Sequence, residues 1–470
     1  MSFANEMSLR FKNKKCCVLG FGRSNRPLVD MLLSAGAQVS VHDGKESVRD
    51  AALEERGVRF CLGESYLDGL SGDYLFRSPG IRYYLSGIQN AVRNGAELTS
   101  EMELFFSLCR ANTIGITGSD GKTTTTTLTH LFLQKELEKK GVGNAYVGGN
   151  IGRPLLPLAP EMTGDDYAIV ELSSFQLMDF HYSPTRALIT NITPNHLDWH
   201  KDYNEYIEAK CNIFRNGSEM LVTNADNEVT AEIAARCELP VTYFSSRKHS
   251  FGEIVPKGRT NCRAIYEDGG VIYVDDGSSR DAILRVSDIL LPGRHNVENY
   301  MAAIGLTQGI VTPQTVTEIA RTFGGVEHRL EFVRTLNGVK YYNSSIDSSP
   351  SRTEAALGAL DVKPIIICGG AEKGIEFDSL ATALCHKVKA VVLTGATAQK
   401  IMQKIENCPD YDPARLPVRL VPDFRDAVIE ASNMAEQGDV VLLSPACTSF
   451  DRFRDFEERG NYFKEIVKGL

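Results

Sequence analysis

The chain has 470 residues, of which 43% are hydrophobic and 24% are charged, and its formal net charge is -9 at pH 7. This composition is ordinary for a folded chain, and at roughly 100–200 residues per domain the length predicts about three domains. The acidic balance argues against a protein that wraps nucleic acid, because such surfaces need clustered lysine and arginine.

No stretch of the sequence predicts a secretory signal or a membrane span. The N-terminal residues MSFANEMSLRFKNKK lack an apolar core, and no apolar run approaches the roughly 18 residues of a span. The 11 cysteines form no C-x-x-C pair, which is typical of reduced thiols rather than a disulfide framework or a zinc ribbon. We therefore expect a cytoplasmic protein with neither a nucleic-acid nor a membrane partner.

The first predicted unit opens like a Rossmann fold. Residues 14–43 read as an apolar strand, a glycine turn, an amphipathic helix and a second strand that ends at Asp43. The dinucleotide fingerprint G-x-G-x-x-G is incomplete, since Gly20 and Gly22 fit it while Asn25 stands at the third position. A tight turn without a ligand is the alternative, because such turns need glycine for positive φ.

A second loop is predicted at the same sheet edge. Ser78, Pro79 and Gly80 directly follow the strand-like run YLFR. Ligands of open α/β sheets bind outside the carboxyl ends of the strands, so this loop is a candidate ligand contact.

The stretch GITGSDGKTTTTTL, residues 115–128, predicts a phosphate loop between a strand and a helix. Gly118 and Gly121 allow backbone N–H groups to face an anion, Lys122 supplies a cation and Thr123 offers a hydroxyl to Mg²⁺. The common spacing G-x-x-x-x-G-K-[ST] is broken, since Ile116 stands at the first glycine. The remaining threonines of the run have an alternative role in facing neighbouring strands or solvent.

Acidic and imidazole side chains follow two later strands. Glu171 stands at the exit of the predicted strand Tyr167 to Val170 and is a candidate Mg²⁺ ligand, with a surface or capping residue as the alternative. The run H-x-D-x-H from His196 to His200 lacks the partners of a zinc site and fits substrate and metal contacts better. Lys210, on the following amphipathic helix, would ordinarily be a solvated lysine.

The rest of the chain completes the layout. Residues 246–286 alternate around Asp-Gly and Gly-Gly turns and predict a small antiparallel annex. Asn296 and Asn299 open another helix, where they suit capping or a nucleotide base edge. The predicted fold is therefore α/β with three domains: a Rossmann-like domain (1–111), a central P-loop ATPase-like domain with the annex (112–326) and a second Rossmann-like domain (327–470).

Seven stretches together resemble one known family. In the order and at the spacing of the Mur ligases, which are ATP-dependent amide ligases of peptidoglycan precursor synthesis, the chain contains GITGSDGKTT, GGNIG, VELSSFQL, NITPNHLDWH, HNVENYMAA, EHRLEFV and LLSPACTSFDRFRDFEERGNYF. The resemblance covers nearly the whole chain from about residue 14. This family writes its phosphate loop T-G-x-x-G-K-[ST], so Ile116 before Thr117 is expected. ELSSFQL and SPACTSFDRFRDFEERG point to the branch that adds D-glutamate.

The resemblance implies an ADP-forming amide ligase with ATP, UDP-N-acetylmuramoyl-L-alanine and D-glutamate as substrates. ATP would phosphorylate the carboxylate of the UDP substrate, because a carboxylate is a poor electrophile until it is given a leaving group. The amine of D-glutamate would then displace phosphate through a tetrahedral intermediate. Lys122 and Mg²⁺ would neutralise charge on the phosphoryl group. We expect two Mg²⁺ ions, a monomer, and a place in cell-wall growth, cell shape and division.

The resemblance also implies roles for individual residues. The catalytic set is Lys122, His196, Lys210 and Arg329, and the ATP-binding set is Gly118, Ser119, Asp120, Gly121, Lys122, Thr123, Thr124, Asn299 and Arg329. The metal ligands are Thr123, Glu171, His196 and Lys210, the last as a carbamate. The UDP-substrate set is Gly22, Arg23, Ser24, Asp43, Ser78, Pro79, Gly80, Asn150 and Ser173. The D-glutamate set is Lys373, Ser449, Phe450 and Phe456, for which a surface lysine, a helix cap and core aromatics are the alternatives.

One segment departs from the family pattern. Many Mur ligases carry N-D-S-K-A-T-N where this chain reads NSSIDSSPSRT from Asn343. Ser344 replaces an acid linked to ATP and Ile346 replaces a lysine. Our hypothesis is that Asp347 and Arg352 compensate, as an acid and a cation shifted along the chain.

The rival functions are another Mur-type ligase, a folylpolyglutamate synthase and two functions of other classes. A nicotinamide-dependent UDP-sugar oxidoreductase would explain the Rossmann-like units but gives SDGKTT no role. A non-catalytic nucleotide-binding regulator is suggested only by Ser344. A folylpolyglutamate synthase shares the architecture, but the features of the first domain and SPACTSF argue against it.

Overall fold

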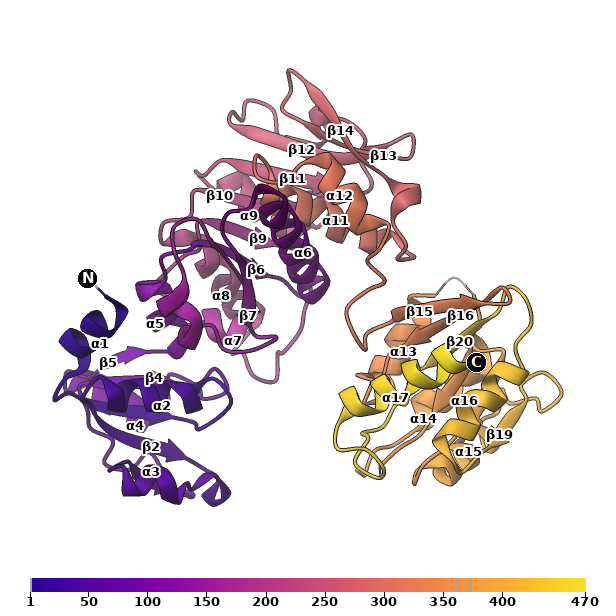
Figure 1. Cartoon of the computed structure of the whole chain (residues 1–470), viewed down its shortest axis with the longest axis horizontal. Coiled ribbons are helices and arrows are strands. Elements are labelled where there is room, and N and C mark those ends of the chain that lie inside the picture. Colours follow the sequence, from indigo (N-terminus) through magenta and orange to yellow (C-terminus); the bar gives the residue numbers. More distant parts are fainter. Residues whose placement is uncertain (1, 361, 372–373) are drawn as a thin grey trace. The chain divides into compact units, whose positions relative to one another are not determined.

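The computed structural model describes residues 2–360, 362–371 and 374–470. By its internal contacts the chain divides into two compact units: unit 1 comprises Met1–Asp288 and Val297–Ile319, and unit 2 comprises Ile289–Asn296 and Ala320–Leu470. Three sheets carry the fold, two in unit 1 and one in unit 2 (Figure 1). Among the described residues, no helix has the length and apolar character needed to cross a membrane.

The first sheet has five parallel strands in the order β3-β2-β1-β4-β5. They are β1 (Lys15–Leu19), β2 (Gln38–Asp43), β3 (Arg59–Leu62), β4 (Tyr74–Arg77) and β5 (Glu97–Thr99). The accompanying helices are α1 (Phe3–Phe11), α2 (Asn25–Ser34), η1 (Glu46–Val48), α3 (Ala51–Glu55), α4 (Ser86–Arg93) and α5 (Glu101–Leu108). The central strand β1 is buried after its first residue, as expected for a parallel strand that is covered on both faces.

The second sheet has nine strands in the order β14-β13-β12-β11-β10-β9-β6-β8-β7. Its strands are β6 (Asn112–Thr117), β7 (Ala145–Gly149), β8 (Tyr167–Glu171), β9 (Arg186–Ile189), β10 (Met220–Asn224), β11 (Val241–Ser245), β12 (Cys262–Asp268), β13 (Val271–Asp275) and β14 (Arg280–Arg285). Its helices are α6 (Lys122–Lys140), η2 (Leu156–Glu161), α7 (Ser174–Leu177), α8 (Tyr203–Arg215), α9 (Glu228–Arg236), α10 (Phe251–Ile254), η3 (Val286–Asp288), α11 (Arg294–Thr307) and α12 (Pro313–Ala320).

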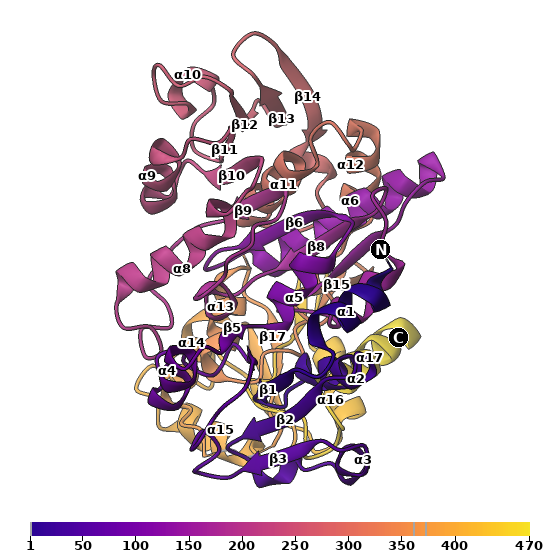
Figure 2. The same ribbon diagram turned by 90° about the vertical axis from the view of Figure 1, so that its left-hand side faces the viewer.

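The predicted antiparallel annex is present, but it is not a separate sheet. β12 pairs in parallel with β11, and β13 and β14 then follow in antiparallel order. Figure 2 shows β14, β13 and β12 continuing the central sheet beyond β11. The sequence indicated the antiparallel turns, whereas the β11–β12 pairing joins segments separated by a helix and carries no local signal.

The sheet of unit 2 has six strands in the order β15-β16-β20-β17-β18-β19. The strands are β15 (Glu331–Leu336), β16 (Val339–Asn343), β17 (Ile365–Cys368), β18 (Ala390–Leu393), β19 (Val418–Leu420) and β20 (Val440–Leu443), and only the β15–β16 pair is antiparallel. The helices are α13 (Pro350–Gly358), α14 (Asp378–Lys387), α15 (Ala398–Glu406), α16 (Phe424–Asn433) and α17 (Phe456–Gly469).

Two separate cores flank the sheet of unit 2. One contains Leu357 of α13, Leu384 of α14 and Ile401 of α15. The other contains Phe424 of α16 and Phe463 of α17. Helices therefore cover both faces of the sheet, which makes it doubly wound.

The predicted fold class, α/β with mainly parallel sheets, is confirmed. The three sheets fall within the predicted ranges 1–111, 112–326 and 327–470, while internal contacts group the first two sheets in one unit. The boundaries themselves stay a prediction.

Candidate active site

The phosphate loop joins β6 to α6 at the carboxyl edge of the central sheet. Gly118 has φ +147° and Gly121 has φ +78°, conformations that side-chain-bearing residues rarely adopt. A Cβ at Gly118 would lie 1.8 Å from Thr190 Oγ1, and one at Gly121 would lie 2.5 Å from Asn299 Oδ1. Glycine is therefore required at both positions by backbone conformation and by space.

The segment after β9 holds this loop in shape. Thr190 Oγ1 donates to the carbonyl of Asp120 at 2.6 Å, and the amide of Asp120 donates to Asn191 Oδ1 at 2.9 Å. The amide of Ser119 donates to the carbonyl of Asn191 at 2.8 Å, and its hydroxyl donates to the carbonyl of Thr193 at 3.0 Å. Sequence reasoning missed Thr190 and Asn191, although their place directly after a strand beside β6 was a usable signal.

Two lysines converge on the phosphate loop. Lys122 Nζ donates to the carbonyls of Gly118 at 2.9 Å and Ser119 at 2.8 Å. Lys210, from α8, is almost completely buried, and its Nζ donates to the same Gly118 carbonyl at 2.8 Å. Burial, reinforced by the charge of Lys122, lowers the pKa of Lys210 well below its usual value. The expectation of a solvated lysine at 210, from residue type alone, is therefore wrong.

Glu171 ends β8 next to the loop, because β8 pairs with β6 and sets Glu171 opposite Ile116. Its carboxylate is buried and accepts one hydrogen bond, from Asn150 Nδ2 to Oε1 at 2.8 Å. Within the described part of the chain, Glu171 Oε2 is buried without any hydrogen-bond partner. An unsatisfied buried carboxylate oxygen is costly, and a hard cation would satisfy it.

His196 lies in the loop after β9 and has a left-handed backbone, with φ +55°. Its ring lies 4.9 Å from that of Phe175. Partial burial, with the charges of Lys122 and Lys210, lowers the pKa of His196 against the opposing effect of Asp198. The imidazole is thus electrostatically coupled to both lysines, and its neutral form, the form that binds metals, is favoured.

The side chain of His200 and the carbonyl of Asp198, in the same H-x-D-x-H run, contact residues other than His196. His200 is buried, with Nε2 2.9 Å from Ser174 Oγ and Nδ1 3.4 Å from Glu205 Oε2. Asp198 uses its carbonyl to accept from Arg82. Across the described residues, no three His, Cys, Asp or Glu side chains gather as a metal cluster. The predicted metal ligands are Thr123, Glu171, His196 and Lys210. Only Glu171 and His196 are of those four residue types, so the lack of such a cluster does not count against this set.

The remaining predicted ATP contacts of unit 1 lie along α6 and α11. Thr123 and Thr124 are half-buried in the first turn of α6. Asn299 is buried on α11, and its Oδ1 accepts from Thr125 Oγ1 at 3.3 Å. The structure therefore brings Asn299 to the helix that follows the phosphate loop.

The first sheet gathers part of the predicted UDP set around its glycine turn. Asp43 Oδ2 accepts from the amide of Phe21 at 2.8 Å, and Ser78 Oγ donates to the carbonyl of Gly20 at 3.2 Å. Asn25 Nδ2 donates to Ser78 Oγ and to the Gly20 carbonyl, at 3.1 and 2.8 Å. The residue that breaks the fingerprint thus ties the turn to the second loop.

The other predicted UDP residues lie at the carboxyl edges of the two sheets of unit 1. Gly22, Arg23 and Ser24 precede α2, and Ser24 is its N-cap without a side-chain hydrogen bond. Pro79 and Gly80 form the turn after β4. On the central sheet, Asn150 follows β7, and Ser173 caps α7 through a capping box with Gln176.

In unit 2, Arg329 sits in a strained loop. The neighbouring His328 and Leu330 both have left-handed backbones, with φ +62° and +42°. Ser344 Oγ accepts from the amide of Leu330 at 3.1 Å, and Asn343 Nδ2 lies 3.0 Å from His328 Nδ1. Such strain persists only where the surroundings enforce it, and it concentrates at functional sites.

The segment that departs from the family pattern faces this loop. Asp347 is buried, its Oδ2 accepts from Ser444 Oγ at 2.8 Å, and it also accepts from Ser344. Burial raises the pKa of Asp347, whereas the charges of Arg329 and Arg352 act to lower it. Asp347 is therefore close enough to both arginines to interact with them, as the compensation hypothesis requires.

Three of the four predicted D-glutamate residues lie around the carboxyl edge of the same sheet. Ser449 is buried after β20, Phe450 is 65% exposed, and Phe456 begins α17 with its ring 5.9 Å from that of His328. Lys373 lies outside the described residues. Of the described members of this set, Phe450 is thus exposed and Ser449 is buried.

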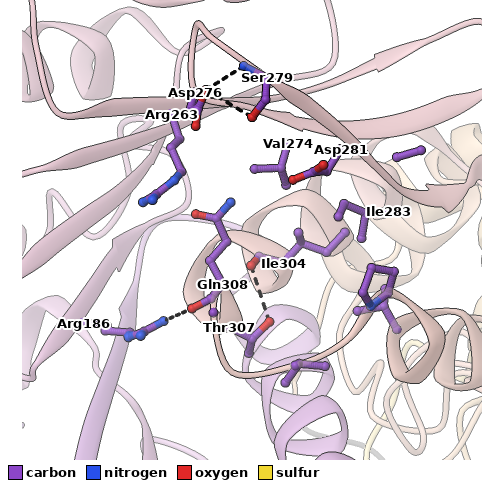
Figure 3. Close-up of a pocket in the computed structure, with 15 residues that line it drawn as sticks. Arg186, Arg263, Val274, Asp276, Ser279, Asp281, Ile283, Ile304, Thr307 and Gln308 are labelled. Atoms are coloured by element: carbon purple, nitrogen blue, oxygen red, sulfur yellow. Dashed lines mark hydrogen bonds between the residues drawn. The ribbon is translucent and has the colours of Figure 1, made fainter.

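A cavity of about 710 Å³ lies elsewhere in unit 1, between the β13–β14 hairpin and the ends of α11 and α12 (Figure 3). It contains none of the predicted site residues. Its charged side chains are of both signs, including Arg263 and Asp281, and Arg186 already donates to the carbonyls of Leu306 and Gln308. The side chains that line this cavity therefore favour no one chemical class of ligand.

Comparison with known proteins places the chain in a family. The Mur ligase middle domain matches residues 116–307, and the Mur ligase, glutamate ligase domain, matches residues 328–447. The chain is 46% identical over 468 residues to the UDP-N-acetylmuramoylalanine–D-glutamate ligase of Ruminiclostridium cellulolyticum, covering 98% of this chain and 97% of that protein. The corresponding ligase of Clostridium kluyveri is 45% identical over 466 residues, with 98% and 97% covered.

Solved structures share the fold at low sequence identity. The UDP-N-acetylmuramate–alanine ligase of Thermotoga maritima has a TM-score of 0.54 at 19% identity, with 97% of this chain and 100% of that chain covered. A UDP-N-acetylmuramoyl-L-alanyl-D-glutamate–2,6-diaminopimelate ligase has a TM-score of 0.56 at 15% identity, covering 98% and 93%.

The chain belongs to the Mur ligase family, which confirms the resemblance found in its sequence. The two relatives at 46% and 45% identity, which match it over nearly their full length, are both named for D-glutamate ligation. Family membership removes the support for a nicotinamide-dependent oxidoreductase.

Proposed function

We propose that the chain joins D-glutamate to UDP-N-acetylmuramoyl-L-alanine in peptidoglycan precursor synthesis, with conversion of ATP to ADP and phosphate. The observation that carries this proposal is the 46% identity, over 98% of the chain, to a ligase named for that reaction. The phosphate loop, the acidic strand end at Glu171 and the buried Lys210, which follow one another in unit 1, support it.

The phosphate loop serves ATP. Gly118 to Gly121 lead into α6, whose first-turn amides, at Lys122 to Thr124, have no acceptor within the helix and therefore suit a phosphate. Lys122, which here donates to loop carbonyls, supplies the cation for the transferring phosphoryl group. Asn299 stands beside α6 on the adenine side. The MurF ligase of Thermotoga maritima, a family member with a TM-score of 0.52, is described in complex with ADP, which supports this assignment.

The donor set fits magnesium. Glu171 Oε2 is a buried oxygen without a partner among the described residues, Thr123 supplies a hydroxyl, and His196 an imidazole whose lowered pKa favours the neutral form. A neutral Lys210 amine can accept carbon dioxide and become an oxygen-bearing carbamate, which a protonated lysine cannot do. Magnesium at these residues would neutralise charge on the phosphoryl groups.

The reaction follows from these assignments. The substrate carboxylate attacks the γ-phosphorus of ATP and ADP leaves, which converts a poor electrophile into an acyl phosphate. The amine of D-glutamate then adds to the acyl carbon, and the tetrahedral intermediate expels phosphate as the amide forms. Lys122 stabilises negative charge at the phosphoryl group in both steps, since its ammonium lies at the phosphate loop.

The substrates divide between the sheets. The glycine turn of the first sheet, with Asp43, Ser78 and neighbouring residues, takes the UDP group, and Asn150 and Ser173 take the muramoyl part. The loops of unit 2 take D-glutamate at Lys373, Ser449, Phe450 and Phe456, and Arg329 reaches ATP. A cytoplasmic monomer remains our expectation.

Phosphate release tests the function directly. Purified chain is supplied with ATP, Mg²⁺ and UDP-N-acetylmuramoyl-L-alanine, with and without D-glutamate. We expect release that depends on D-glutamate, loss of release in Lys122→Ala, and normal release in the exposed control Lys257→Ala. Phosphate release at the same rate with and without D-glutamate would contradict the substrate assignment. No phosphate release at all would favour the non-catalytic regulator.

A further inference from the structure

Arg459 is a buried cation without a counter-charge in direct contact. It lies on α17, its side chain is 2% exposed, and it forms no ion pair with any carboxylate of the described residues. All three of its hydrogen bonds go to neutral acceptors: Nε donates to Ser345 Oγ at 3.0 Å, one terminal nitrogen to the Ser345 carbonyl at 2.8 Å and the other to the Cys447 carbonyl at 3.1 Å. Buried charges are normally paired, so this arrangement needs an explanation.

The charge of Arg459 persists at neutral pH. Burial lowers its pKa to about 10, which still leaves the guanidinium protonated. Two carboxylates, Asp451 and Asp347, act on it only through space, and Asp347 also interacts with Arg329 and Arg352. Arg459 therefore keeps its positive charge with no carboxylate of the described residues in direct contact.

Arg459 stands where three loops of the sheet meet. Ser345 follows β16, Cys447 follows β20, and a Cβ at Gly370, after β17, would lie 3.2 Å from a terminal nitrogen of Arg459. These strands are neighbours in the order β16-β20-β17. Ligands of doubly wound sheets bind outside the carboxyl ends of such strands. The described D-glutamate residues assigned above, Ser449, Phe450 and Phe456, come from the loop after β20 and from the start of α17.

We propose that Arg459 makes this site selective for an acidic amino acid. Its charge attracts the carboxylates of the incoming substrate, which offset it on binding, while its hydrogen bonds hold the loops after β16 and β20 in place. Arg459 is a positioning and specificity residue. It acts through its charge and through the loops that it holds, and it does not contact the substrate. This inference rests on the proposed function.

The test compares a charged with a neutral amino acid. Initial rates are measured with varied D-glutamate and, separately, varied D-glutamine, for Arg459→Gln, Arg459→Lys and the wild type. The matched control is Arg454→Gln, which removes the same charge from an exposed side chain of the same segment. For Arg459→Gln we expect a rise of about tenfold in the KM for D-glutamate, with less than about twofold change in the KM for ATP.

The decisive readout is the ratio of kcat/KM for D-glutamate to that for D-glutamine. It should fall in Arg459→Gln and stay close to the wild-type value in Arg459→Lys and Arg454→Gln. An equal loss for both amino acids would overturn the inference, because a purely structural role predicts it. If Arg459→Gln does not fold, the folded Arg459→Lys variant provides the test. A fall of its D-glutamate to D-glutamine ratio of kcat/KM would overturn the inference, and a ratio close to the wild-type value would support it.

The wild-type rates separate the two proposals. A wild type that uses a different acidic amino acid would contradict the proposed function and leave the role of Arg459 standing. A wild type that uses D-glutamine as well as D-glutamate would overturn the role of Arg459 and leave the ligase assignment intact.

Discussion

Lys122 and Lys210 share one acceptor, since both Nζ atoms donate to the carbonyl oxygen of Gly118, at 2.9 and 2.8 Å. Two positive charges at one oxygen repel each other, and Lys210 is the buried partner. The repulsion and the burial both favour a neutral amine at Lys210. Lys122, at the first turn of α6, keeps the cationic role.

Replacing Lys210 by arginine is predicted to lower kcat by roughly 100-fold or more, the range seen when one charge-stabilising group is lost. Arginine stays charged and forms no carbamate. The check is kcat together with a carbamate signal in carbon-13 NMR after addition of labelled bicarbonate, present in the wild type and absent in the variant. Lys210→Gln serves as a smaller second variant, and wild-type kcat in both would remove Lys210 from the mechanism.

Glu171→Gln is predicted to raise the half-saturating Mg²⁺ concentration by about ten- to a hundredfold, because it removes the negative charge of a buried carboxylate whose Oε2 has no protein partner among the described residues. A magnesium titration of phosphate release measures the change. Glu161→Gln, an exposed glutamate of η2, should titrate like the wild type. An unchanged titration for Glu171→Gln would place the ion elsewhere.

The compensation hypothesis predicts that Asp347→Ala raises the KM for ATP several-fold, since the variant removes the acid that interacts with Arg329. The double variant Ser344→Asp/Asp347→Ala returns the acid to the position that many family members use, and it should recover much of the lost affinity. Steady-state kinetics with varied ATP decide the matter. An unchanged KM in Asp347→Ala would exclude Asp347 from this role.

The raised pKa of the buried Glu101 carboxyl predicts that the stability of the folded protein depends on pH. Burial raises its pKa from 4.5 to about 7, partly offset by a backbone hydrogen bond from Leu156. The folded state therefore binds a proton that the unfolded state releases, so stability falls as the pH rises from about 4.5 to about 7 and then levels off. At 1.36 kcal/mol per pKa unit, the loss is roughly 3 to 3.5 kcal/mol.

Glu101→Gln should remove this dependence and raise the midpoint of thermal unfolding at pH 8 more than at pH 5. Thermal unfolding between pH 5 and pH 9 tests it, with exposed Glu55→Gln as the control. Parallel pH curves for Glu101→Gln and the wild type would show that Glu101 titrates normally.

Local patterns predicted much of the fold. The opening strand-turn-helix of the first sheet and a helix after the phosphate loop were readable, because glycine and apolar periodicity act over a few residues; the sequence predicts that helix from Thr123 to a stop at Gly141, and the structure begins it one residue earlier, at Lys122. The β11–β12 pairing was not, since it joins segments separated by a helix; for the loop contacts of Thr190, which join residues far apart in the sequence, the only signal was its place directly after a strand. The unusual state of Lys210 was also hidden, because burial is a property of the fold rather than of the residue type.

The glycines of the phosphate loop have a consequence for how this protein can change. At Gly118 and Gly121 any side chain would meet Thr190 or Asn299 at distances that real Cβ atoms do not adopt. A single substitution there would damage the loop that the cell needs for cell-wall growth, so resistant mutants at these positions should be rare. An inhibitor that draws its affinity from the main chain of this loop would therefore face a target with few routes of escape.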